Sequence, residues 1–255
     1  MIRIGTSGWD YPHWNARFYP PGLPHAERLR FYARHFDTVE INRSYYRLPT
    51  REQFAGWRAE VAGVDGDFVF AAKASRYITH LKKLRDVEEA LARLVEAASG
   101  LGADRGPYLY QLPPHWRADP DRLAAFVALL PRDARNAFEF RDPSWYTPRV
   151  LDILHDNNCA LVVAVGGALT TPADVPAVGP FRYIRFHSGQ HGIGLDADEL
   201  AYWSGCIATD AAAGLDVYAY FNNDPEGYAV RDAKVLLRLL AAGPARPLVA
   251  QGGAV

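Results

Sequence analysis

Short apolar runs that end in polar residues recur eight times along the chain, and stretches with helical periodicity lie between them. The runs cover residues 2–7, 38–42, 68–73, 107–111, 137–141, 161–165, 183–187 and 217–222. Strands that alternate with helices are typical of a parallel sheet. Eight such units in 255 residues match the length and repeat of a TIM barrel. We therefore predict the α/β class and one (β/α)8 TIM-barrel domain over residues 1–255, with a C-terminal tail from about residue 242.

Capping signals mark several helix starts. Asp86 and Glu89 have the spacing of a capping box. Three further pairs place a capping carboxylate before a proline in the first turn: Asp119-Pro120, Asp142-Pro143 and Asp224-Pro225. The last two pairs directly follow strands five and eight, so these helices are expected to begin at the mouth of the barrel. Residues 166–180 carry many proline and glycine turn signals, and the helix expected after the sixth strand has the weakest pattern.

Alternation along each strand assigns its side chains to the barrel axis or to the helix layer. In the fifth strand, Phe138 and Phe140 point towards the helices, which leaves Glu139 facing the axis. The same parity gathers eight polar residues at the axis, mostly near strand ends: Glu40, Asn42, Lys73, Gln111, Glu139, Arg141, Arg185 and His187. A packed barrel core favours Val, Ile and Leu, and TIM-barrel enzymes carry their sites at this end. The pattern therefore predicts an active-site-like pocket.

The charges of this cluster favour a small anionic ligand. Two carboxylates face three cations and a histidine, so we expect a net positive pocket suited to phosphate or carboxylate. Asn222, Asn223 and the free N–H groups of the helix that begins at Asp224 would add donors. A purely structural arrangement is the alternative, in which the charges pair as Glu40 with Arg185 and Glu139 with Arg141. Lys73 has two alternative roles in these arrangements: it is either a salt-bridge partner or an amine that forms a Schiff base.

The resulting hypothesis is a hydrolase or isomerase of a phosphorylated sugar or nucleotide-like compound. Glu139 and Glu40 are the expected acid and base, His187 the proton shuttle, and Lys73 a further catalytic residue and anion ligand. The expected substrate-binding residues are Asn42, Gln111, Arg141, Arg185, Asn222, Asn223, Trp9 and Tyr46. The sequence does not identify a cofactor. A divalent metal on Glu40, Glu139 and His187 is the weaker alternative, because these three residues follow no recognised ligand spacing.

Aromatic residues crowd the same end of the predicted barrel and suggest an alternative function. Trp9, Tyr11 and Trp14 follow the first strand, and Tyr45 and Tyr46 follow the second. Such rings stack on sugars or nucleobases, so a non-catalytic nucleic-acid-binding protein is the competing hypothesis. The rings would otherwise close the barrel top by packing.

Composition sets the remaining bounds. The chain is 49% hydrophobic and 22% charged with a formal net charge of −1, which is typical of a globular protein and gives no sign of a nucleic-acid or membrane partner. Only two cysteines occur, Cys159 and Cys206, which supports neither a disulfide framework nor a zinc-ribbon spacing. The first residues form a strand rather than a signal peptide, and no apolar run reaches membrane-span length. We therefore expect a cytoplasmic protein.

Several motifs resemble one known family. They are Ile4-Gly5-Thr6-Ser7-Gly8-Trp9, Thr38-Val39-Glu40-Ile41-Asn42, Lys73-Ala74-Ser75-Arg76-Tyr77, Gln111-Leu112-Pro113-Pro114, Phe138-Glu139-Phe140-Arg141 and Tyr220-Phe221-Asn222-Asn223-Asp224. From residue 2 to about 241 the chain resembles the family called domain of unknown function seventy-two, or YecE-like. The resemblance implies a TIM barrel without an established activity, similar to the xylose-isomerase and endonuclease-IV-like group. Val165-Gly166 stands where the family pattern has an acidic residue, which weakens the metal hypothesis.

Overall fold

Eight parallel strands close into a barrel in the computed structural model, which describes residues 1–64, 66–167 and 170–243. Each strand pairs with the next one along the chain, and the eighth pairs with the first. The strands are β1 (Ile2–Ser7), β2 (Thr38–Ile41), β3 (Val69–Lys73), β4 (Arg105–Gln111), β5 (Asn136–Glu139), β6 (Cys159–Val165), β7 (Phe181–Phe186) and β8 (Asp216–Phe221). This arrangement confirms the predicted (β/α)8 TIM barrel.

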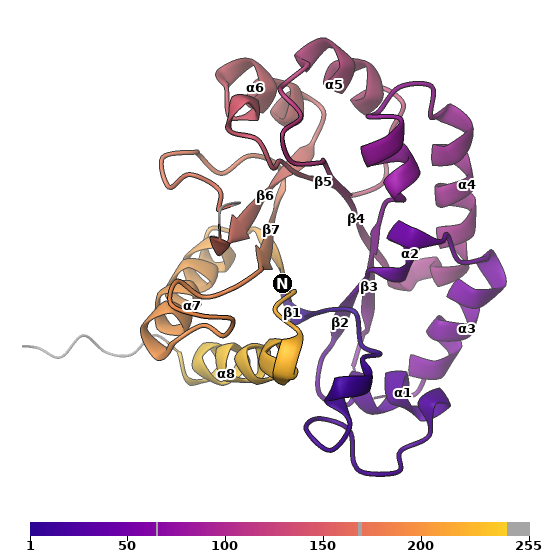
Figure 1. The fold of residues 1–255 in the computed structure, drawn as a ribbon, viewed down its shortest axis with the longest axis vertical. Coiled ribbons are helices and arrows are strands. Elements are labelled where there is room, and N and C mark those ends of the chain that lie inside the picture. Colours follow the sequence, from indigo (N-terminus) through magenta and orange to yellow (C-terminus); the bar gives the residue numbers. More distant parts are fainter. Residues whose placement is uncertain (65, 168–169, 244–255) are drawn as a thin grey trace, which may run out of the picture.

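Helices surround the strands in Figure 1. The α-helices are α1 (Arg28–Ala33), α2 (Arg43–Tyr46), α3 (Arg51–Val61), α4 (Glu88–Ala98), α5 (Pro120–Val127), α6 (Pro148–Asp156), α7 (Ala197–Ala212) and α8 (Tyr228–Ala242). Shorter helical turns are η1 (Pro12–Trp14), η2 (His25–Glu27), η3 (Tyr77–Leu81), η4 (Ser99–Asp104), η5 (Pro143–Trp145) and η7 (Pro225–Gly227). Between β6 and β7 no α-helix occurs in the described residues, in keeping with the weak helix pattern there. The predicted tail lies outside the described residues from 244 onwards.

Side-chain alternation separates two apolar regions, as the strand parity predicts. One cluster fills the barrel interior with Ala71, Leu109, Ala137, Ala160, Val162, Phe181, Tyr183, Tyr218 and Tyr220. The larger cluster lies between strands and helices and includes Val39, Ile41, Phe138, Phe140, Ile184 and Phe186. Tyrosine rings occupy much of the interior cluster, in which Tyr183 and Tyr220 lie 5.2 Å apart between ring centroids. Apolar side chains thus fill the barrel interior. The polar side chains that also face the axis lie at the C-terminal ends of the strands.

Two of the predicted caps form and two do not. Asp119 accepts a hydrogen bond from the Arg122 backbone N–H at the start of α5, and Asp142 accepts one from that of Ser144. Asp86 forms no capping box, because α4 begins only at Glu88, after a turn in which Asp86 has a φ of 50°. That turn buries two apolar residues, Leu84 and Val87, which explains the later start. The Asp224 side chain caps no helix either.

No described helix is both long and apolar enough to cross a membrane.

Two glycine substitutions should have opposite effects on stability. A Cβ at Gly5 in β1 would lie 2.1 Å from the Thr38 carbonyl oxygen, so we expect Gly5→Ala to cost about 1–3 kcal/mol of unfolding free energy. Gly56 lies within α3 and has no atom within 4 Å of an added Cβ. Gly56→Ala should therefore stabilise the helix by about 0.5–1 kcal/mol. Urea unfolding measures both, and a Gly5→Ala protein as stable as the parent would contradict the close approach of β1 and β2.

Candidate active site

A buried ion-pair cluster lies on the barrel axis and consists of Arg185 on β7, Glu40 on β2 and Glu139 on β5. All three side chains are completely buried. Nη2 and Nε of Arg185 donate to the two carboxylate oxygens of Glu40 at 2.8 and 3.0 Å. Nη1 of Arg185 donates to Oε2 of Glu139 at 2.6 Å. We call these three residues the Arg185 cluster, and it ties together three separated strands of the barrel.

Neighbouring polar groups complete the hydrogen bonding of the Arg185 cluster. The Tyr183 hydroxyl donates to Oε2 of Glu40 at 2.7 Å, and the Ser7 hydroxyl donates to Oε1. Nη1 of Arg185 also donates to Oε1 of Gln111 at 3.2 Å. Buried charges are tolerated only when they are paired and hydrogen-bonded, and here each one is.

The charges within the cluster keep both carboxyl groups ionised. Burial alone would raise the pKa of Glu40 and of Glu139, but the surrounding positive charges and hydrogen-bond donors, with Arg185 first among them, together outweigh it. The pKa of Glu40 is therefore lowered, and that of Glu139 falls well below its ordinary value of 4.5. A carboxyl group with this environment is a poor proton donor or acceptor at neutral pH.

A second polar layer covers the Arg185 cluster on the side of the barrel mouth. Arg141 donates to Oε1 of Glu139 from Nε at 2.9 Å and from Nη2 at 2.6 Å. Nε2 of His187 lies 3.1 Å from the same oxygen, and its Nδ1 lies 3.1 Å from the Asn222 amide nitrogen. Asn42 in turn donates to Oδ1 of Asn222 at 3.4 Å. Residues that follow β2, β5, β7 and β8 thus form one hydrogen-bonded layer.

His187 is neutral in this layer and both of its ring nitrogens are engaged. Burial lowers the pKa of His187, and the Arg185 and Arg141 guanidiniums lower it further against the opposing effect of Glu139. Since the Asn222 amide donates, Nδ1 is the acceptor, which assigns the ring hydrogen to Nε2. Nε2 then donates to Oε1 of Glu139, and Nη2 of Arg141, itself a donor, lies 3.2 Å from Nε2 without accepting from it.

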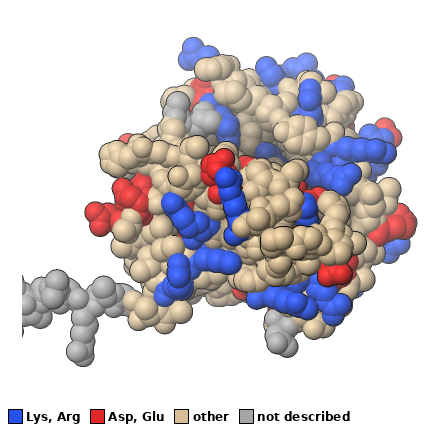
Figure 2. Space-filling model, turned by 60° about the horizontal axis from the view of Figure 1, so that its bottom comes forward, with Lys and Arg blue, Asp and Glu red and all other residues tan. Residues whose placement is uncertain are grey.

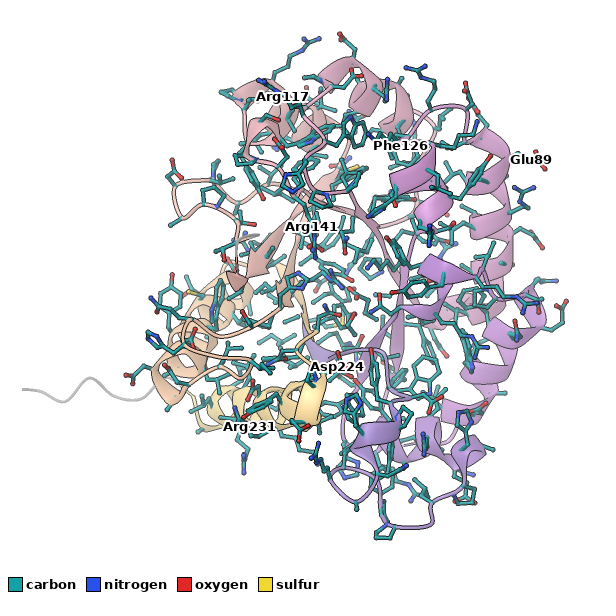
Figure 3. All side chains as sticks on the ribbon, in the orientation of Figure 1. Glu89, Arg117, Phe126, Arg141, Asp224 and Arg231 are labelled. Carbon is teal, nitrogen blue, oxygen red and sulfur yellow. The ribbon has the colours of Figure 1, made fainter. Side chains whose placement is uncertain are left out.

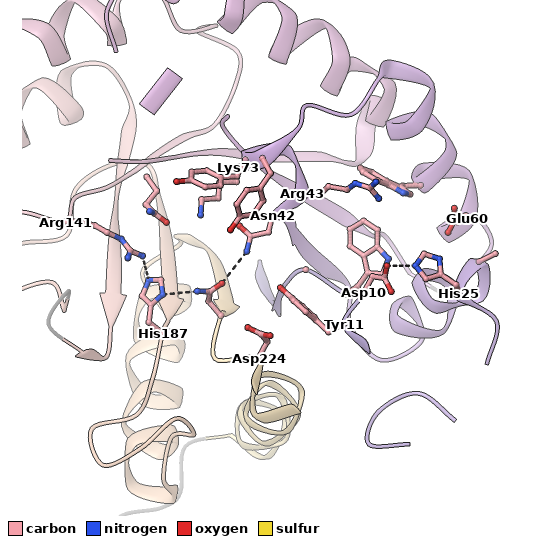
Figure 4. A pocket seen from close by; sticks show the side chains of 18 residues that line it. Asp10, Tyr11, His25, Asn42, Arg43, Glu60, Lys73, Arg141, His187 and Asp224 are labelled. Atoms are coloured by element: carbon pink, nitrogen blue, oxygen red, sulfur yellow. Dashed lines mark hydrogen bonds and ion pairs between the residues drawn. The ribbon is translucent and has the colours of Figure 1, made fainter. Parts of the chain in front are cut away.

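Above this layer opens a pocket of about 750 Å³ (Figure 4). Its wall is formed by Gly8, Trp9, Asp10, Tyr11, His25, Ala26, Asn42, Arg43, Tyr45, Tyr46, Trp57, Glu60, Lys73, Gln111, Arg141, His187, Asn222 and Asp224. In Figure 3, Arg141 and Asp224 lie inside the ring of helices, whereas Glu89 lies on its outside. Lys73 and Gln111, which line the pocket, are the last residues of β3 and β4. The pocket therefore lies at the C-terminal end of the strands, as the sequence pattern predicts.

Lys73 is a buried basic residue of this pocket that has no acidic partner among the described residues. Its side chain is 7% exposed, and Nζ lies 4.4 Å from the centroid of the Tyr45 ring. Among the described residues, no carboxylate lies within 4.0 Å of Nζ, and no side-chain hydrogen bond to it occurs, so Lys73 is not the predicted salt-bridge partner. Burial, followed by the charge of Arg185, lowers the pKa of Lys73 to about 7.

The charge of the pocket differs from the net positive expectation. In the floor, Arg185 and Arg141 balance Glu40 and Glu139, and the charge that remains is that of Lys73. Other parts of the wall carry three carboxyl groups, from Asp10, Glu60 and Asp224. Of the side chains that line the pocket, Arg43, Lys73 and Arg141 are basic and Asp10, Glu60 and Asp224 are acidic, so the pocket carries both signs of charge rather than one.

Asp224 and Asp10 lie in different surroundings within this wall. Asp224 lies 3.3 Å from Nε2 of His13, and burial raises the pKa of Asp224. Asp10 accepts from Arg28 at 2.7 Å and lies 2.5 Å from Nε2 of His25. Asp224 thus faces the pocket as a carboxyl group that holds its proton more tightly than usual.

Most of the predicted site residues meet at the pocket, but four do not line it. Glu40, Glu139 and Arg185 lie beneath the wall, because their charges pair in the closed barrel interior. Asn223 points away, since its amide donates to the Ile193 carbonyl oxygen and to Asp232. The remaining predicted residues line the pocket: Trp9, Asn42, Tyr46, Lys73, Gln111, Arg141, His187 and Asn222.

Sequence reasoning missed part of the wall. Asp10, His25, Arg43, Trp57 and Glu60 come from loops and helices rather than from strand ends. Strand parity carries no information about such positions. The i, i+3 spacing of Trp57 and Glu60 on α3 shows only in retrospect that both occupy one helix face.

The weak metal candidates do not form a ligand set. Glu139 contacts His187, but Arg185 holds Glu40 on the other side of the cluster. Within the described ranges, no group of three histidine, cysteine or acidic side chains could hold a metal ion.

Removing one charge of the Arg185 cluster should destabilise the fold strongly. We expect Glu40→Gln to cost about 3–5 kcal/mol, because it leaves Arg185 buried with one carboxylate fewer. The matched control is Glu89→Gln, which removes a carboxylate from an exposed pair with Arg93 and should cost under about 1 kcal/mol. Since the folded pKa of Glu40 is lowered, its contribution is present above pH 4.5 and is lost as the pH falls further. Denaturant titrations at several pH values measure both effects, and equal losses in the two variants would contradict the cluster's role.

Replacing Lys73 should instead stabilise the protein. The pKa of Lys73 is about 7 in the folded chain and 10.5 ordinarily, so the unfolded chain binds the proton more tightly between these values. Wild-type stability therefore falls as the pH drops from 10.5 to 7. Lys73→Met should be more stable than wild type at pH 7 by an amount on the order of 3 kcal/mol, and the gap should shrink towards pH 10. Thermal unfolding of both proteins across this range would contradict the assignment if the gap stayed constant.

Comparisons with known proteins agree with this architecture. A sequence model of the family described as "Protein of unknown function DUF72" matches residues 3–252. The chain is 32% identical to UPF0759 protein YecE of Escherichia coli over 57% of its own length and 50% of YecE, and thus spans about half of that relative. It is 22% identical to UPF0759 protein YunF of Bacillus subtilis over 94% of this chain and 95% of YunF.

Solved structures show the same fold. The crystal structure of a DUF72 family protein from Thermotoga maritima matches with a TM-score of 0.79 and 22% identity, covering 94% of this chain and 99% of that one. A DUF72 family protein from Enterococcus faecalis matches with a TM-score of 0.79 and 20% identity over 94% and 96% of the two chains. The family match extends over nearly the whole chain, and the barrel is shared. This chain therefore belongs to the DUF72 family of proteins of unknown function.

Proposed function

We propose that the protein is an enzyme whose pocket binds a small hydroxylated anion, such as a phosphorylated sugar or a nucleotide-like compound, with Lys73 as the reactive group. The observation that carries this proposal is the Lys73 amine, which is buried at the pocket without an acidic partner. An anionic group of a ligand would supply the counter-charge that the chain itself does not provide.

The other side chains near Lys73 suit an oriented, polar ligand. Arg141 and the amides of Asn42, Gln111 and Asn222 line the pocket and offer hydrogen bonds to hydroxyl or phosphoryl oxygens. Trp9, Tyr11, Tyr45, Tyr46 and Trp57 provide aromatic faces for a sugar ring or a base. The volume of about 750 Å³ lies within the usual range for small-molecule sites.

Isomerase-type chemistry fits this site better than glycoside hydrolysis. Hydrolysis of that kind needs two carboxyl groups that flank the substrate. Glu40 and Glu139 instead lie beneath the pocket wall, held by Arg185, so we assign them the support of the site rather than proton exchange with substrate. Lys73 has a pKa of about 7, and the lone pair of its neutral amine can accept a proton or attack an electrophilic carbon. Asp224 faces the same pocket and is our candidate acid.

Nucleic-acid binding is the second candidate function, and the rim of the pocket is the observation that favours it. Tyr46 lines the pocket and is 75% exposed, and exposed rings of this kind stack on bases. In the face drawn in Figure 2, however, lysine and arginine side chains occur in separate groups with acidic side chains among them. Phosphate backbones favour broad basic surfaces, so a small anion remains the better supported ligand.

Binding of a sugar phosphate should depend on Lys73. We expect ribose 5-phosphate or fructose 6-phosphate to raise the melting temperature of the wild-type protein, and the unphosphorylated sugars to have little effect. Lys73→Met should weaken this binding at least about tenfold, since a charge-assisted contact contributes roughly 1.5–3 kcal/mol. Lys82→Met is the matched control, because Lys82 lies outside the pocket wall.

Calorimetry adds an independent readout of the same event. A bound anion favours the charged amine, so binding at pH 8 should take up protons, and the apparent enthalpy should vary with the ionisation enthalpy of the buffer. Binding that survives Lys73→Met unchanged would overturn the proposal. Stabilisation by a short single-stranded DNA alone, with strong salt dependence, would favour the nucleic-acid alternative.

A further inference from the structure

The Lys73 amine is held by a rigid strand at the wall of a cavity. Lys73 is the last residue of β3, and its carbonyl oxygen accepts a hydrogen bond from the Ser44 hydroxyl at 2.6 Å. The next residue, Ala74, donates its backbone N–H to the Leu109 carbonyl oxygen at 2.8 Å. The backbone is therefore fixed on both sides, and Figure 4 shows the amine pointing into the pocket.

The neighbours of Lys73 leave the amine free to react. Both carboxylates of the Arg185 cluster have their oxygens engaged by Arg185 and adjacent donors. The Tyr45 ring packs against Nζ on one side, which limits the access of water to that side. A buried lysine without a counter-ion loses its proton more easily and becomes a nucleophile.

We propose that Lys73 forms an imine with the aldehyde or ketone group of the pocket's ligand. The inference rests on the proposed function, since it names the substrate class of the same site as an anionic carbonyl compound. It assigns Lys73 as a covalent catalytic residue, which goes beyond anion binding.

The step balances without any added reagent. The neutral amine attacks the carbonyl carbon, a C–N bond forms, and the electron pair of the C=O bond moves to oxygen, which gains a proton to give a carbinolamine. In the carbinolamine the nitrogen has released one of its two protons, which balances the proton gained by the oxygen. The hydroxyl group then takes up a further proton and leaves as water, while the nitrogen lone pair forms the C=N bond and the nitrogen keeps its remaining hydrogen. Asp224, on another side of the pocket in Figure 4, is the carboxyl group whose environment suits proton delivery to the departing oxygen. A proton on the imine nitrogen then makes the adjacent C–H acidic, which is the change that isomerisation requires.

Reductive trapping tests this proposal on the full chain. The protein is incubated with sodium cyanoborohydride and either dihydroxyacetone or dihydroxyacetone phosphate, and the modified residues are located by peptide mass spectrometry. Hydride reduces the C=N bond to a stable secondary amine. The other lysines, Lys82, Lys83 and Lys234, are internal controls for non-specific modification. We expect Lys73 to be labelled at least about tenfold faster than each control at pH 7.5, because an amine with a lowered pKa is neutral at this pH.

The two probes separate this inference from the proposed function. Preferential labelling of Lys73 by both probes, faster with the phosphate, supports the imine and the anion site together. Equal rates for the two probes at Lys73 support the imine and contradict anion binding. Lys73 labelled no faster than the three controls overturns the imine, and the proposed function then stands only if the phosphate still raises the melting temperature.

Two variants keep the result interpretable. Lys73→Arg retains a positive charge but has no nucleophilic amine, so it should keep anion-dependent stabilisation and lose the trapped adduct. Asp224→Asn should slow trapping severalfold while thermal stabilisation by the phosphate persists. Trapping in Asp224→Asn at the wild-type rate would remove Asp224 from the proton-delivery role.

Discussion

A single guanidinium between two carboxylates is the constraint on which the rest of this site depends. Arg185 connects β7 to Glu40 on β2 and to Glu139 on β5, so the top of the barrel interior is closed by charge pairing rather than by apolar packing. A buried ion pair contributes little net stability compared with apolar packing, but the loss of one partner costs much. The fold therefore depends on all three charges, and Glu139 also positions the polar layer above it through Arg141 and His187.

The Arg185 cluster also explains why Lys73 has the properties of a reactive group. Both nearby carboxylates are engaged by Arg185, and Arg141 takes a further position on Glu139. Lys73 thus lies among guanidiniums without a counter-ion of its own, and its pKa falls to about 7. A buried amine without a counter-ion lowers the stability of the fold, but it provides a group that exchanges its proton near neutral pH. A lysine with a purely structural role would pair with a carboxylate, whereas Lys73 lines a cavity of about 750 Å³.

Sequence pattern predicts the barrel and most of the polar cluster because strand parity is a local property. Glu139 faces the axis since its neighbours Phe138 and Phe140 pack against helices, and no long-range information is needed to see it. Parity does not tell how deep a side chain lies, so it could not distinguish the buried Glu40 from the pocket-lining Gln111. Loop and helix residues of the wall, such as Asp10 and Glu60, depend on tertiary packing that no periodicity encodes. The Asp-Pro signal predicts that Asp224 caps a helix, but its carboxylate instead lies against His13 and faces the pocket.

The distribution of charge in the pocket constrains the ligand further than its total charge does. Protonated Lys73 offers one uncompensated positive charge at the floor, whereas Glu60 and Asp224 in the remaining wall pair with no lysine or arginine of the described residues and repel anions. A ligand with one compact anionic group, directed towards Lys73, and hydroxyl groups directed towards these carboxylates would satisfy both regions. A polyphosphate or a longer nucleic-acid strand would place further negative charge against the acidic wall, where like charges are disfavoured. Imine formation then restricts the ligand to compounds whose carbonyl carbon is close to the anionic group, as in dihydroxyacetone phosphate, because both groups must reach the Lys73 amine.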